Sequence, residues 1–173
     1  MADRVRALLL LDAVPWTRTL RALDACPALA SRVAVCVARA PPSGLNADGL
    51  GLHILARLES PAGVRDVLFC KAKHGDFAPS LAGGDECCRG PLYRALGILS
   101  RDRKVISECM ALATHFLNAA AASATPDLAQ FDKYCEEAQR KDGGHRLVFR
   151  KAAPKMDITT DLPDLSKLPY FLR

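Results

Sequence analysis

The sequence lacks most of the features that would identify its chemistry directly. It contains no Gly-Lys-Ser/Thr phosphate loop, no dinucleotide-binding glycine fingerprint and no serine elbow. Four histidines in the whole chain leave few candidates for acid–base catalysis. No apolar run approaches the ~20 residues that a membrane-spanning helix needs. These absences predict a soluble protein that is not an enzyme, with no catalytic residue, metal or cofactor.

The seven cysteines are odd in number, and none forms a Cys-x-x-Cys pair. Cys36 and Cys109 lie within apolar runs, where a free thiol behaves as a small hydrophobe. This usage is typical of a reducing compartment rather than of a disulfide scaffold. The apolar run 7–11 is too short for a secretory signal, and acidic residues nearby argue against a transit peptide. We expect reduced cysteines and an intracellular location, cytoplasmic or nuclear first and mitochondrial as the alternative.

Length and composition fit one globular domain. Of the 173 residues, 50% are apolar and 25% charged, which allows a core that is stable without disulfides or metal. We expect a single α+β domain over residues 1–153 and an extended apolar tail over residues 154–173. The net charge of +5 is a mild basic excess that permits nucleic-acid binding without requiring it.

Apolar periodicity predicts the element order β-α-β-β-β-α-α-β. The expected strands cover residues 5–14, 33–38, 52–58, 66–73 and 145–151, and the expected helices cover residues 15–26, 91–122 and 125–142. The pattern over residues 91–122 does not show whether this segment is one helix or two. With short connections between the middle strands, we expect an antiparallel meander of three to five strands, packed by two long C-terminal helices.

The helix over residues 125–142 has the clearest local signals. Thr125 can cap its start, Pro126 suits the first turn, and Asp127 faces the positive end of the helix. Two glycines at 143 and 144 are typical of a helix end. The apolar stripe expected to be buried consists of Leu128, Phe131, Cys135 and Ala138.

Two groups of cysteines could carry chemistry. Cys70 and His74 have a spacing that zinc tolerates, but the adjacent Cys87 and Cys88 are awkward as two ligands of one tetrahedral ion. We therefore expect no metal site. Cys87 and Cys88 also precede a predicted helix start, next to Arg89, where a thiolate would be stabilised. A thiol-dependent enzyme or redox sensor at these cysteines is one alternative function.

A second alternative is an RNA-associated protein that uses the basic C-terminal third. Acidic residues interleave with this segment, so a solvated surface explains the same pattern. If the chain binds RNA, the residues expected to contact phosphate are Arg140, Lys141, Arg146, Arg150 and Lys151.

The apolar tail is the feature that most favours a protein partner. Disordered tails are usually polar, whereas this one carries six large apolar side chains among its last twelve residues, and Pro163 and Pro169 discourage a long helix. We predict a non-enzymatic interaction module or accessory subunit of a larger intracellular assembly, which docks partly through this tail in cis or in trans. A homo-oligomer remains compatible with the sequence. The expected partner-binding residues are Leu162, Leu165, Leu168, Tyr170, Phe171 and Leu172.

Overall fold

The structure is a computed structural model, and it describes residues 6–12, 25, 33–41, 64–77, 95, 99–100, 104–122 and 127–151. The predicted strand over 52–58 and most of the predicted helix over 15–26 lie outside these residues. So do Cys87, Cys88 and the tail over 154–173.

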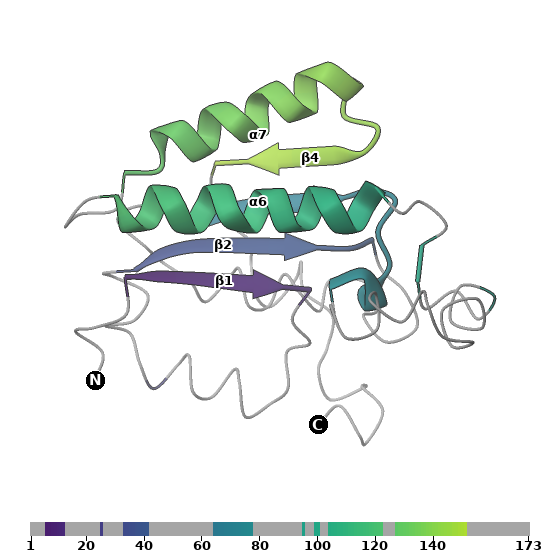
Figure 1. The fold of residues 1–173 in the computed structure, drawn as a ribbon, viewed down its shortest axis with the longest axis horizontal. Coiled ribbons are helices and arrows are strands. Elements are labelled where there is room, and N and C mark those ends of the chain that lie inside the picture. The colour runs from purple at the N-terminus through teal and green to yellow at the C-terminus, as the bar shows by residue number, and fades with distance from the viewer. Residues whose placement is uncertain are drawn as a thin grey trace, which may run out of the picture.

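The described residues form an α+β arrangement of a mixed four-stranded sheet and two helices (Figure 1). The strands pair in chain order, β1 and β2 in parallel, β2 and β3 in parallel, and β3 and β4 antiparallel. The elements are β1 (Ala7–Leu11), β2 (Ala34–Arg39), β3 (Val64–Phe69), η2 (His74–Phe77), α6 (Lys104–Ala121), α7 (Ala129–Asp142) and β4 (Leu147–Arg150).

The predicted antiparallel meander is wrong, because the first three strands run in the same direction. Parallel neighbours need a crossover of a dozen or more residues. Residues 12–33 and 40–63, which separate these strands, are both long enough. The predicted strand at 52–58 made the second connection look like a short turn, whereas β2 pairs directly with β3. The fourth strand is antiparallel, as a meander would require.

Both helices cover one face of the sheet, and Figure 1 shows them side by side with α7 next to β4. The side chains of β2 beneath this layer are small, namely Ala34, Cys36 and Ala38, and all are fully buried. Small side chains let a helix approach the strand closely, and β1 and β2 both contact α6. The buried stripe of α6 follows helical spacing and includes Val105, Cys109, Leu112 and Phe116.

Aromatic rings join the two helices to the edge strand. Phe131 of α7 meets Phe116 of α6 at 5.3 Å and Phe149 of β4 at 6.3 Å between ring centroids, both edge to face. Such pairs add about 0.5–1.5 kcal/mol each beyond burial of their area. The predicted stripe on α7 is confirmed, with Leu128, Phe131 and Cys135 buried and Ala138 half-buried.

The helix bounds differ from prediction at their starts. α7 begins at Ala129 with Leu128 as its N-cap residue, and Asp127, one residue earlier, accepts the Ala129 N–H through Oδ1 at 2.9 Å. Thr125 and Pro126, predicted to start the helix, lie outside the described residues. Its end is as predicted, because Gly143 adopts the left-handed conformation that closes the helix. Leu99 and Ser100 are not helical, so no single helix runs through residues 91–122.

Candidate functional site

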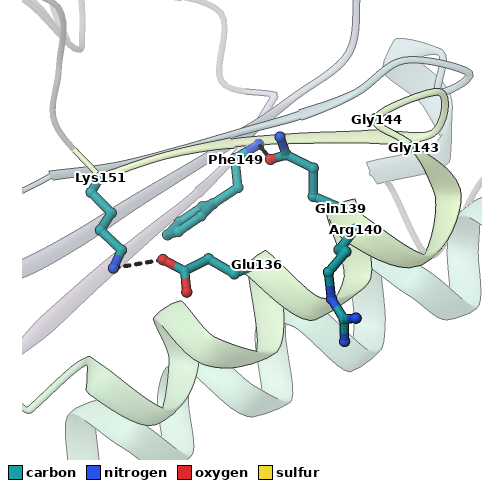
Figure 2. Close-up of a pocket in the computed structure, with 7 residues that line it drawn as sticks. All are labelled: Glu136, Gln139, Arg140, Gly143, Gly144, Phe149 and Lys151. Carbon is teal, nitrogen blue, oxygen red and sulfur yellow. Dashed lines mark hydrogen bonds and ion pairs between the residues drawn. The ribbon is translucent and has the colours of Figure 1, made fainter.

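The basic residues predicted to contact phosphate do not form one patch. Arg140 and Lys151 line a hollow of about 490 Å³ between α7 and β4, together with Glu136, Gln139, Gly143, Gly144 and Phe149 (Figure 2). Lys151 is already paired there, with Nζ 2.6 Å from Oε1 of Glu136. Figure 2 shows the Arg140 side chain extending away from this pair. The hollow therefore holds an ion pair rather than converging cations.

The other predicted phosphate contacts are dispersed. Arg146 makes an ion pair with Glu108 of α6 at 3.0 Å. Leu147 and Phe149 belong to the core under the helices, so strand alternation places Arg150 on the opposite face of the sheet. Lys141 is exposed at the end of α7. Cations divided between two faces, some with acidic partners, do not make the continuous basic surface that a nucleic-acid backbone needs.

The outer face of α6 is apolar and exposed. Met110 is 53% exposed and Leu117 is 49% exposed, and they lie two turns apart on the same side of the helix. Ile106 and Ala113, both half-buried, complete a 4-3-4 spacing with them. We call these four residues the α6 stripe. Apolar side chains at this spacing are typical of a seam between two helices.

The surroundings of the α6 stripe carry little polarity. The sequence has no Asp, Glu, Lys or Arg between Glu108 and Asp127. Thr114, next to the stripe, donates its hydroxyl proton to the Met110 carbonyl of its own helix at 2.9 Å. The exposed positions of α7, in contrast, include Lys133, Glu136, Arg140 and Lys141. A solvated helix usually carries charges along its outer face, as α7 does, whereas α6 carries them only at Lys104 and Glu108, near its start.

A second group of polar side chains lies where the parallel strands end. Asp12 directly follows β1, and its side chain is 0% exposed. Its Oδ1 accepts the Ala40 N–H at 2.9 Å, and its Oδ2 lies 2.7 Å from Nδ1 of His74. Asp12 has φ 42°, in the left-handed region that few residues other than glycine adopt. One carboxylate thus connects the segments that follow β1, β2 and β3.

The loop that carries His74 is fixed by a second buried acid. Oδ2 of Asp76 accepts the Lys73 N–H at 2.8 Å, and its Oδ1 accepts the Ser100 N–H at 3.1 Å. Phe77 packs edge to face on Phe69 of β3, with ring centroids 5.9 Å apart. Backbone and aromatic contacts therefore hold both sides of His74 in place.

Sequence reasoning did not identify this group. From the sequence, His74 was considered only as a zinc ligand beside Cys70. In the structure its partner is Asp12, which lies 62 residues away in the chain. No group of His, Cys, Asp and Glu that could hold a metal occurs in the part of the chain that the structure describes. The signal that could have found the site is an acidic residue directly after a buried apolar strand, followed later by a histidine after another strand.

The described cysteines lie mostly in the core. Cys36, Cys109 and Cys135 are buried and free. Burial raises the pKa of Cys109 to about 12 and of Cys135 to about 12, and raises that of Cys36 well above its ordinary value. These thiols stay protonated at neutral pH and are poor nucleophiles.

Comparison of the chain with known protein families, with curated proteins and with solved structures finds no match. Among the described helices, none combines the length and the apolar character needed to cross a bilayer.

Proposed function

We propose that this chain is a protein-interaction module whose α6 stripe docks an amphipathic helix of a partner protein. The exposure of Met110 and Leu117 on a helix face without charges is the observation that carries the proposal. Exposed apolar residues that gather on one face mark interaction sites more often than scattered ones do.

The occupant follows from the shape and charge of the face. The 4-3-4 spacing of the stripe matches the ridges of a second helix, and the small Ala113 lets that helix approach closely. Because α6 has no ionised group to pair with after Glu108, the partner should also present apolar side chains there. A partner rich in acidic or basic side chains would lose hydration without gaining an ion pair.

The apolar tail supports the same kind of function from sequence alone. Its six large apolar residues, Leu162, Leu165, Leu168, Tyr170, Phe171 and Leu172, would provide a second contact if the tail docks in trans. The α6 stripe does not depend on this contribution, because it is built within the described fold.

Site-specific photo-crosslinking in the source cells tests the proposal. A photoreactive residue at position 117 should capture one partner protein through a helical peptide, whereas the same residue at the exposed position 133 of α7 should not. With that partner purified, Leu117→Glu should lower the affinity at least about tenfold, which corresponds to about 1.4 kcal/mol, and Lys133→Glu should leave it unchanged.

Two results would contradict this proposal. Equal crosslinking from positions 117 and 133 would show that the α6 stripe is not a specific surface. A crosslink to a second copy of this chain, with a dimer in sedimentation analysis, would replace the partner protein by self-association.

A further inference from the structure

The pairing of Asp12 with His74 determines what the imidazole can do. Because the Asp12 carboxylate can only accept at 2.7 Å, Nδ1 of His74 carries the proton and Nε2 of the neutral ring is an acceptor. Within the described ranges, Asp12 is the one hydrogen-bond partner of this ring. The His74 side chain is 33% exposed, so water reaches the ring while the orienting carboxylate stays buried. A base held by a buried carboxylate in this way is suited to proton transfer.

The place of this pair in the fold also suits ligand binding. In open sheets with parallel strands, ligands bind beyond the carboxyl ends of the strands. Asp12 and Ala40 follow the ends of β1 and β2, and His74 begins η2, which lies beyond the arrowheads of these strands in Figure 1. Lys71 and Lys73 are exposed in the same loop and bring positive charge to this end of the sheet.

We propose that His74 is a general base, positioned by Asp12, that activates water for hydrolysis of a carboxylic ester. This activity is separate from helix docking at α6. Nε2 takes a proton from water while the water oxygen bonds to the acyl carbon and the carbonyl π electrons move to the carbonyl oxygen. When the intermediate collapses, the bond to the alcohol oxygen breaks and the imidazolium returns the proton to that oxygen. One water and one ester thus become an acid and an alcohol. Positive charge from the loop favours the negative charge that develops on the carbonyl oxygen.

The buried acids explain why the base would be effective. Asp12 fixes the tautomer of His74. Asp76 holds the backbone just before His74 by accepting the Lys73 N–H, and is itself held by the Ser100 N–H. A base that is already oriented loses little entropy when the substrate binds. The unusual φ of Asp12 fits this reading, because strained backbone persists where the surrounding structure holds a functional group in place.

Hydrolysis of p-nitrophenyl acetate by the full chain tests the inference. The wild type should show saturable hydrolysis, and His74→Gln should lower kcat/KM at least about 100-fold. Asp12→Asn should lower kcat and move the pH–rate profile, because an amide does not hold the same tautomer. His145→Gln, at an exposed histidine in the turn before β4, is the matched control and should keep the wild-type rate.

Nitrogen-15 NMR of the wild type gives a readout independent of turnover, and should show the proton of the neutral His74 ring on Nδ1. If Asp12→Asn fails to fold, the partly exposed His74→Gln variant and this spectrum still decide the question. A wild-type rate that does not saturate, an unchanged rate in His74→Gln, or a proton on Nε2 would each overturn the proposal.

Discussion

Gln139 of α7 accepts the backbone N–H of Phe149 through Oε1 at 2.7 Å, so a helix side chain occupies the outer edge of β4 (Figure 2). The backbone N–H of Cys70 donates to the Arg146 carbonyl, next to the β3–β4 pair. Because hydrogen-bonded and non-bonded pairs alternate along an antiparallel ladder, the N–H groups of Leu147 and Phe149 point away from β3. Asp142 accepts the Leu147 N–H at 3.2 Å. Edge strands with free N–H groups invite pairing with other chains, and α7 satisfies both of these donors.

This relationship predicts that Gln139→Ala destabilises the fold by about 1–2 kcal/mol, because it leaves the Phe149 N–H without its acceptor. Gln130→Ala, at an exposed position of the same helix, should change the free energy of unfolding by less than about 0.5 kcal/mol. Urea denaturation of both variants measures the difference. Equal losses would mean that the hydrogen bond at the edge adds no stability.

The Arg65–Asp132 pair predicts a larger effect. It joins β3 to α7 through two hydrogen bonds of 2.8 and 2.9 Å, and each side chain is 11% exposed. Asp132→Ala should cost about 3–5 kcal/mol, because it leaves a guanidinium poorly hydrated and without its carboxylate. The double variant Arg65→Met with Asp132→Leu should lose much less stability, as measured by urea denaturation. A double variant as unstable as the single one would show that the charges themselves are not what the site requires.

Local sequence signals predicted part of this fold and could not predict the rest. Alternation identified β2, and the apolar stripe with its closing glycines identified α7, because these patterns are written in neighbouring residues. Strand direction is less directly encoded, and it was indicated only by the long connections and by the continuous apolar runs of β1 and β2, which are typical of parallel strands covered on both faces. The Asp12–His74 contact depends on sheet order, which brings together residues 62 positions apart.

The α6 stripe and the predicted phosphate contacts also differ in how far the sequence alone reveals them. The α6 stripe was visible in principle, because the run without charges after Glu108 overlaps the helical spacing from Ile106 to Leu117. The separation of Arg150 from Arg140 was not, because it requires knowing which face of β4 meets α7. The prediction that the tail docks remains a prediction, since it concerns residues outside those described.

The raised thiol pKa values predict a loss of stability at high pH. In the unfolded chain the thiols deprotonate near pH 9.0, whereas Cys109 and Cys135 keep their protons until about pH 12 when folded. Their contribution is therefore complete below pH 9 and is lost as the pH rises toward 12. Each thiol adds a slope of up to about 1.4 kcal/mol per pH unit there. Between pH 8 and 11, the free energy of unfolding should decline less steeply for Cys135→Ala than for the wild type. Parallel declines would contradict a raised pKa of the Cys135 thiol in the folded protein.

The packing of α7 predicts the sharpest contrast between two positions in one helical turn. Phe131 is buried between Phe116 and Phe149, so Phe131→Ala removes a ring that joins both helices to β4. Such a truncation should cost about 3–5 kcal/mol, from lost burial and from the cavity it leaves. Lys133 is exposed on the opposite side, and Lys133→Ala should cost almost nothing.

Chemical denaturation measures the free energy of unfolding of both variants, and the two values are comparable when the dependence on denaturant concentration has the same slope. Near-ultraviolet circular dichroism reports whether the remaining aromatic rings stay packed. If Phe131→Ala were as mild as Lys133→Ala, α7 would not hold β4 against the sheet in the way that the ring contacts indicate. The hydrogen bond from Phe149 to Gln139 also requires α7 to lie against β4. The losses of stability from Phe131→Ala and Gln139→Ala should therefore be less than additive in the double variant. A fully additive double variant would show that the ring and the amide stabilise β4 independently.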